Sequence, residues 1–156
     1  MDYRWDLCER ARFNDRAYNH THELFQLLLK VDAIFQDYDI TYTLTHGTLI
    51  GVKRNNQMNS YEADVDVRVN YNTRLPVDAF SERGLVLFRD RGTWRVCARR
   101  TDGKLKRTKW LRSPWSGNCF PFLDIFPSRD FPNEIEWDRM GNANVPVPLN
   151  ALQELE

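Results

Sequence analysis

Cysteine is scarce in this sequence, and its spacing does not suit the two structural roles that cysteine usually has. The 156 residues contain three cysteines, Cys8, Cys97 and Cys119, with no CxxC pair and no Cys/His spacing of a zinc site. An odd, widely spaced set disfavours both a disulfide framework and a structural zinc ion. We therefore expect the thiols to be reduced.

A long apolar run is also absent. No segment approaches the ~18 consecutive apolar residues that mark a transmembrane helix. The N-terminal segment MDYRWDLCERARFNDR is charged from its second residue, whereas a signal peptide would need an apolar stretch there. The sequence therefore predicts neither a leader nor a membrane anchor.

An excess of charge is missing as well, because 22 basic and 22 acidic residues give a formal net charge of zero. This balance makes a nucleic-acid partner unlikely on composition, and a hydrophobic content of 42% favours one folded domain over residues 1–156. The basic residues are nevertheless concentrated between Arg89 and Arg112. We interpret this run most simply as a solvated strand face, with a diphosphate donor, an anionic glycan or nucleic acid as alternative ligands.

The pattern of apolar residues predicts an α/β domain. Spacings of three and four predict a helix over residues 21–38 with Thr21 as its N-cap, and strict alternation predicts a half-buried strand over residues 63–69. Asp102-Gly103 predicts a tight turn that pairs residues 94–100 with 105–111. The other predicted elements are a strand at 39–44, short helices after Gly47 and near 77–82, strands at 85–88, 93–99 and 120–126, and a turn-rich segment from Pro127 to a helix start at Ala151.

Two aspartates lie on the polar side of the predicted strand at 63–69. Asp64 and Asp66 place their carboxylates on one face at roughly 5–7 Å, where their repulsion is about 2–3 kcal/mol at an effective dielectric constant of 20. Mg²⁺ or Mn²⁺ would remove this repulsion. Asp124, a lone acid in the apolar strand FPFLDIF, is a candidate third ligand. The alternative is a solvated face on which Arg68 pairs with the aspartates, with a structural role for Asp124.

A glycine-containing junction precedes these aspartates. Gly47 lies between a predicted strand and a short helix, where free backbone N–H groups suit a phosphate. The Thr48 hydroxyl can cap this turn or bind the phosphate, and His46 can donate a hydrogen bond to it. Lys53 and Arg54 follow one to two turns later. Taken alone, such a junction is more often a plain turn than a ligand site.

Together, these segments resemble the LicD family. GTLIG, then Arg54, then YEADVDV is similar to the family pattern GTLLG, an arginine three residues on, and PWDDDIDI. The segments FPFLDIFP and NVPVPLNALQEL also resemble the family's later segments, and the resemblance covers about residues 40–152. It implies a nucleotidyltransferase (polymerase-β-like) fold with a small mixed β-sheet and flanking helices.

The resemblance also implies a metal-dependent phosphotransferase. Family members transfer phosphocholine to surface glycans, and fukutin and fukutin-related protein transfer ribitol phosphate from a cytidine diphosphate donor. The expected partners are therefore a CDP-linked phospho-alcohol and a glycan or glycolipid acceptor. Mg²⁺ or Mn²⁺ is expected at Asp64, Asp66 and Asp124, and substrate contacts are expected at His46, Gly47, Thr48, Lys53, Arg54 and Glu62. The alternatives are nucleotidyl transfer to a small molecule or an RNA end, and a non-catalytic ligand-binding relative.

The chain departs from the family pattern just before the aspartate pair. Ser60, Tyr61 and Glu62 stand where the family has proline, tryptophan and its first aspartate, and Ala63 replaces another acid. The family also usually continues with more helix after the VPVP segment. The transferred group therefore stays open. Bacterial relatives act in the cytoplasm and animal relatives in the Golgi lumen. Because the sequence predicts no leader, we expect a cytoplasmic protein, with the Golgi lumen as the alternative for a domain of a longer chain.

Overall fold

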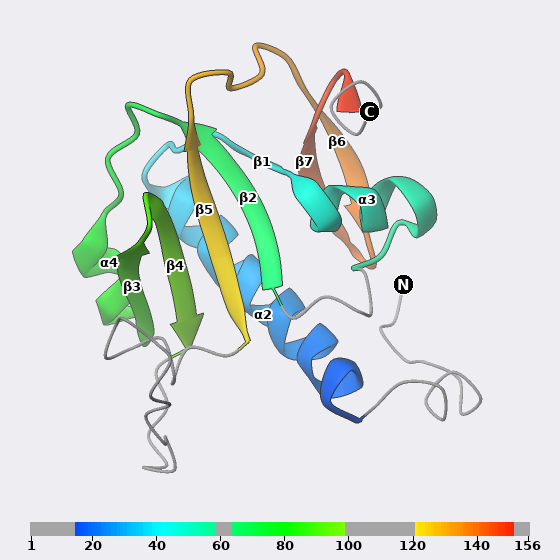
Figure 1. Ribbon diagram of the computed structural model, residues 1–156, viewed down its shortest axis with the longest axis horizontal. Coiled ribbons are helices and arrows are strands. Elements are labelled where there is room, and N and C mark those ends of the chain that lie inside the picture. The colour runs from blue at the N-terminus through cyan, green and yellow to red at the C-terminus, as the bar shows by residue number, and fades with distance from the viewer. Residues whose placement is uncertain (1–14, 59–63, 99–120, 152–156) are drawn as a thin grey trace.

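The computed structural model describes residues 15–58, 64–98 and 121–151 (Figure 1). The elements are α2 (Asp15–Asp37), β1 (Tyr42–Leu44), α3 (His46–Asn55), β2 (Asp64–Asn70), α4 (Val77–Glu82), β3 (Leu85–Asp90), β4 (Thr93–Ala98), β5 (Phe122–Ser128), β6 (Ile135–Met140) and β7 (Ala143–Pro148). Five strands form a mixed sheet in the order β1-β2-β5-β4-β3, in which β2 and β5 are parallel and the other neighbours are antiparallel. The expected α/β class, with a small mixed sheet and flanking helices, is confirmed.

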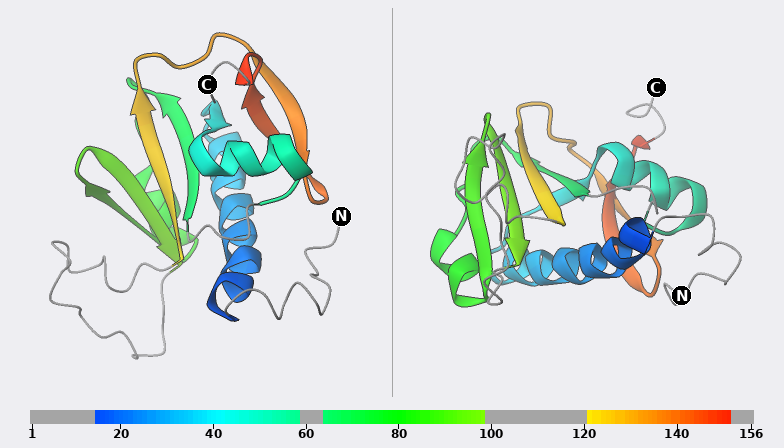
Figure 2. Two further views of the ribbon diagram at one scale, coloured as in Figure 1. Left: turned by 45° about the vertical axis from the view of Figure 1, so that its right-hand side comes forward. Right: turned by 60° about the horizontal axis from the view of Figure 1, so that its bottom comes forward.

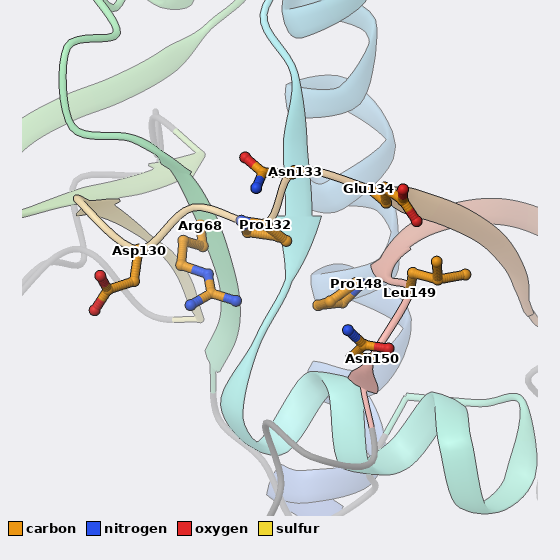
Figure 3. A pocket seen from close by; sticks show the side chains of 8 residues that line it. All are labelled: Arg68, Asp130, Pro132, Asn133, Glu134, Pro148, Leu149 and Asn150. Carbon is orange, nitrogen blue, oxygen red and sulfur yellow. The ribbon is translucent and has the colours of Figure 1, made fainter.

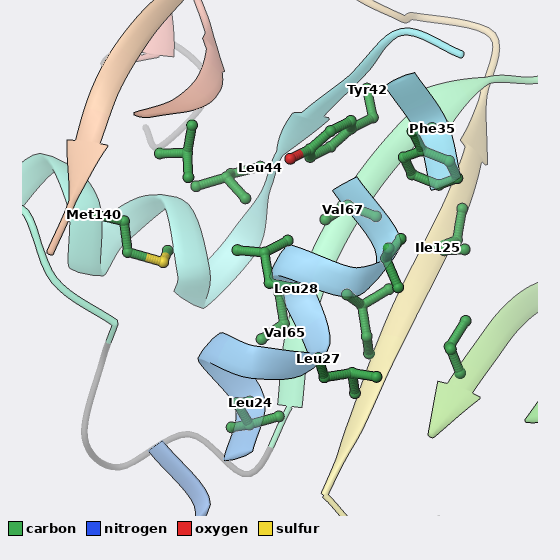
Figure 4. Close-up of a cluster of buried hydrophobic side chains, with 14 of the residues drawn as sticks. Leu24, Leu27, Leu28, Phe35, Tyr42, Leu44, Val65, Val67, Ile125 and Met140 are labelled. Carbon is green, nitrogen blue, oxygen red and sulfur yellow. The ribbon is translucent and has the colours of Figure 1, made fainter. Parts of the chain in front are cut away.

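Helix α2 covers one face of this sheet (Figure 2). Its leucines and Phe35 meet the valines of β2 and Ile125 of β5 in a shared hydrophobic core (Figure 4). Full burial of one such side chain stabilises the fold by about 1.5–3 kcal/mol, so this contact fixes the helix on the sheet. The helix begins at Asp15, earlier than expected, and Thr21 lies inside it with 1% of its surface exposed. The expectation that Thr21 is the N-cap is therefore wrong.

Strand β2 has apolar side chains on one face of the sheet and charged side chains on the other. Its three valines are at most 1% exposed on the side of α2. Because successive side chains of a strand point to opposite faces, Asp64, Asp66 and Arg68 share the other side. Helix α3 lies near this polar side, between β2 and the β6–β7 hairpin (Figure 1). The arrangement leaves the charged residues of β2 on the side of the sheet that α2 does not cover.

Strands β6 and β7 form a hairpin where the sequence predicted only turns. Gly141 and Asn142 form its two-residue turn, and Gly141 has a positive φ of 61°, as the first central residue of a type II′ turn requires. The sequence analysis missed this strand because β7 contains prolines, and proline is usually confined to sheet edges. In the structure Pro146 and Pro148 lie opposite Trp137 and Ile135 of β6.

Strand β4 has different neighbours from those expected. Thr93–Ala98 pairs with β3 along its whole length, and Trp94, Arg95 and Val96 also pair with β5 on the other edge. These three residues therefore have no free edge for the predicted pairing with residues 105–111. The Asp102-Gly103 turn and its second strand lie outside the described residues.

The expectation of reduced thiols is wrong for Cys97. This residue of β4 is 3% exposed and disulfide-bonded, and its partner lies outside the described residues. Disulfides persist mainly in oxidising compartments.

Among the described residues, no helix is both long and apolar enough to cross a membrane.

A partly buried hydrogen bond joins β1 to α2. The Tyr42 hydroxyl is on a residue that is 4% exposed, and it donates to Asp32 Oδ1 at 2.7 Å. Burial, together with the Asp32 carboxylate, raises the pKa of Tyr42 far above its ordinary value, so the hydroxyl remains a donor throughout the physiological pH range.

We expect Tyr42→Phe to lower the free energy of unfolding by about 1 kcal/mol, because one partly buried hydrogen bond is lost while the ring stays in place. Urea denaturation at neutral pH measures this change. Tyr38→Phe is the matched control, since Tyr38 is 52% exposed and its hydroxyl is accessible to water. Equal effects of the two substitutions would contradict a structural role for the Tyr42 hydroxyl.

Candidate functional site

Three carboxylates converge on the polar face of the central strands. The parallel register sets Asp66 of β2 directly beside Asp124 of β5, and Asp64 lies two residues before Asp66 on the same face. One oxygen from each of the three lies within 4.8 Å of the others. The sequence pattern placed Asp64 and Asp66 together, and the pairing of β2 with β5 adds Asp124.

Two of the three carboxylates are largely shielded from water, and Asp64 is half-buried. Asp66 is 8% exposed and Asp124 is 7% exposed. Burial raises the pKa of Asp124, and Asp64 and Asp90 act in the same direction, whereas hydrogen bonds from Arg95 act against them. A buried carboxylate is costly unless it is paired or bound to a cation. The site therefore requires positive charge close to Asp124.

Arg95 supplies part of that charge from the neighbouring strand. The β4–β5 register places it directly beside Asp124. Its Nε and Nη2 donate to the two Asp124 carboxylate oxygens at 2.9 and 3.3 Å, and Asp90 lies 3.5 Å from its Nη1. The guanidinium carbon also lies 3.8 Å from the centre of the Phe122 ring. The sequence assigned Arg95 to a basic run, and the contact with Asp124 was missed because it depends on strand order.

The donor set suits a hard divalent cation. Three carboxylates provide the oxygen ligands that Mg²⁺ and Mn²⁺ prefer. The Arg95 guanidinium offsets one of the three negative charges, so two remain. Asp64 and Asp66 each have an oxygen within 4.8 Å of the Asp124 oxygen. These residues therefore fit a divalent ion on both charge and geometry.

Helix α3 is joined directly to the strand that carries this cluster. The backbone N–H of Thr45 donates to the carbonyl oxygen of Asp66 at 3.0 Å, and the N–H of Asp66 donates to Thr48 Oγ1 at 2.9 Å. Thr48 is 2% exposed, so its hydroxyl holds Asp66 in place within the core. Gly47, in the first turn of α3, is only partly buried. The N-terminus of α3, a favourable place for an anion, thus lies beside the segment of β2 that carries Asp66.

His46 is exposed at the start of α3 and has a φ of 51°, which is uncommon for a residue with a side chain. Its ring meets the ring of Phe126 edge to face at 5.0 Å between centroids. Phe126 lies two residues after Asp124 and pairs with Arg68 of β2. The imidazole is therefore on the same side of the sheet as the carboxylates.

Lys53 and Arg54 lie at the other end of α3. Lys53 Nζ contacts Glu136 at 3.0 Å and Asp138 at 3.2 Å, and these acids raise its pKa although burial acts to lower it. Arg54 is exposed in the last turn, about 10 Å along the axis from Gly47. The structure thus joins Lys53 to the β6–β7 hairpin. Glu62 lies outside the described residues.

A comparison with protein families agrees with this arrangement. The family described as LicD/FKTN/FKRP, nucleotidyltransferase domain, matches residues 39–155. The match contains α3, all three aspartates and both sheets. No curated protein matches the chain significantly.

We expect Arg95→Gln to lower the free energy of unfolding in the absence of divalent metal by about 1–3 kcal/mol, because the buried Asp124 carboxylate loses its ionic partner. Arg89→Gln is the control, since Arg89 is an exposed arginine on the neighbouring strand. Urea denaturation in a chelating buffer measures both. A loss no greater than that of the control would show that Arg95 does not stabilise Asp124.

The effect of Arg95→Gln should also depend on pH. Burial already raises the pKa of Asp124 above 3.8, and removal of Arg95 raises it further. The native state then holds a proton that the unfolded state has released, so the variant loses stability relative to wild type as pH rises from about 4 to 7. Denaturation series over that range measure the difference. A difference that does not vary with pH would assign the lost stability to packing alone.

Proposed function

Because the chain belongs to the LicD/FKTN/FKRP family, we propose that it is a metal-dependent phosphotransferase. It would move a phospho-alcohol, of the phosphocholine or ribitol phosphate type, from a CDP-linked donor to a hydroxyl of a glycan or glycolipid. The observation that supports this proposal best is the convergence of Asp64, Asp66 and Asp124 within 4.8 Å. Three carboxylates at one point favour phosphoryl chemistry over simple ligand binding, because they suit a cation that can hold a diphosphate.

Asp64, Asp66 and Asp124 would hold Mg²⁺ or Mn²⁺. The bound ion would supply charge neutralisation for the diphosphate and for the oxygen that leaves. Gly47 and the first turn of α3 would receive a phosphate through free N–H groups, since that turn lies beside Asp66. Thr48 would act indirectly through its hydrogen bond to the Asp66 N–H.

The reaction needs one proton acceptor. The acceptor hydroxyl attacks the phosphorus that carries the alcohol, the phosphoanhydride bond breaks, and cytidine monophosphate leaves. Asp124, whose carboxylate lies beside Asp66, would either help to hold the ion or accept the proton of the attacking hydroxyl. His46 is exposed on the same side of the sheet and would contact a phosphate there. Arg54 and Lys53, at the far end of α3, would contact only a more distant part of the substrate.

The compartment belongs to the same proposal. A cytoplasmic enzyme would keep its cysteines reduced, but Cys97 is disulfide-bonded. Because oxidising compartments maintain disulfides, this bond supports the Golgi lumen, the alternative to the cytoplasm, as the compartment that we propose.

We expect Asp64→Asn and Asp66→Asn each to lower kcat by at least about 100-fold, because each removes a charge from the cation site. The release of cytidine monophosphate from CDP-choline or CDP-ribitol, in the presence of a glycan acceptor and of Mg²⁺ or Mn²⁺, measures turnover. Asp78→Asn is the control, since Asp78 is exposed on α4. Full activity of either variant, or turnover in a chelating buffer, would refute the proposed function.

The same assay separates the proposal from its rivals. A nucleotidyltransferase would leave the cytidylyl group on the acceptor and release the phospho-alcohol. A non-catalytic relative would bind the CDP compound without releasing either product. Donor labelled separately in the cytidine and in the alcohol therefore identifies which group is transferred.

A further inference from the structure

A pocket of about 560 Å³ opens at the end of β2 that lies beyond the aspartates. Its walls come from β2, from the connection between β5 and β6, and from the residues at the end of β7 (Figure 3). Small-molecule sites usually have about 300–1,000 Å³. The pocket is therefore large enough for a sugar-sized group.

The pocket and the carboxylate site share strand β2. Arg68 lines it and follows Asp66 by two residues on the same face of β2, which is a separation of roughly 7 Å. Arg68 also pairs with Phe126, whose ring meets His46. A substrate whose phosphate lies at the carboxylates can therefore extend its next group into the pocket.

The lining has the chemistry of a hydroxyl-binding surface. Its polar residues are Arg68, Asp130, Asn133, Glu134 and Asn150, and the others are two prolines and a leucine. Figure 3 shows the Arg68 guanidinium between Asp130 and Asn150. Carboxylates accept hydrogen bonds, guanidinium groups donate them, and amides do both. A hydroxyl, which donates and accepts, can pair with each of these side chains.

The same lining disfavours choline and the cytosine base. No aromatic side chain is among the described residues of this pocket. A quaternary ammonium group such as choline is usually recognised by aromatic faces, and a pyrimidine base commonly stacks on an aromatic ring.

We propose that this pocket binds the hydroxyl-rich part of the substrate, with Arg68, Asn133 and Asn150 as its contacts. The hydroxyls belong either to the polyol of a CDP-linked polyol donor or to a sugar of the acceptor. This assignment rests on the proposed function, and it selects a polyol or sugar over choline as the group beside the carboxylates.

Calorimetric titration of the full chain with Mn²⁺ and CDP-ribitol, CDP-choline or CDP tests the proposal. Asn133→Ala and Asn150→Ala alter the pocket, and Asn144→Ala is the matched control, because it is an exposed asparagine of β7 outside the pocket. If the pocket holds the donor's polyol, each pocket variant should weaken CDP-ribitol by roughly 3- to 10-fold, the effect of one lost hydrogen bond. CDP-choline and CDP should stay within about 2-fold.

A second titration identifies the other source of hydroxyls. Lactose and maltose are added to the protein already loaded with Mn²⁺ and CDP, and weaker sugar binding in the pocket variants alone would assign the pocket to the acceptor. The proposal is overturned if both pocket variants match the control for CDP-ribitol and for the sugars, or if CDP-choline weakens as much as CDP-ribitol. Metal-dependent binding of CDP in that case would leave the proposed function standing, whereas a wild-type chain that binds none of the CDP compounds would refute both.

Discussion

The parallel pairing of β2 with β5 is the constraint on which the site depends. It sets Asp66 directly beside Asp124, at the distance of neighbouring strands, about 4.8 Å. The backbone ladder and the apolar core on the α2 side enforce this contact, although the two carboxylates repel each other. A slip of one residue would turn the valines of β2 away from the core, so the register that buries the core also brings the acids together.

The neighbouring elements make this unfavourable arrangement tolerable. Arg95 reaches Asp124 from β4 with two hydrogen bonds, and α3 holds both backbone polar groups of Asp66 through Thr45 and Thr48. None of these contacts removes all of the negative charge. The fold thus positions the carboxylates firmly and leaves their charge for a cation to neutralise.

Patterns local to one segment could be predicted from the sequence, and features that depend on distant pairing could not. The alternation in β2 predicted the strand and its aspartate pair, and the lone acid of the apolar strand FPFLDIF made Asp124 a candidate third ligand. The family resemblance predicted the fold. Arg95 was missed because its role depends on β4 lying next to β5. The contacts of Lys53 with Glu136 and Asp138 could not be predicted, because the sequence does not show that the end of α3 packs on β6. The prolines of β7 concealed the last hairpin.

Helix α3 is fixed at both ends, and this has a mechanical consequence. Its first turn is hydrogen-bonded to Asp66, and its last turn is joined to the β6–β7 hairpin by Lys53 and by the Gly141 N–H, which donates to the Asn56 carbonyl oxygen at 2.8 Å. A ten-residue helix is a stiff body about 15 Å long. Displacement of the hairpin is therefore transmitted to the strand that carries the aspartates, so the hairpin and the carboxylate cluster cannot shift independently.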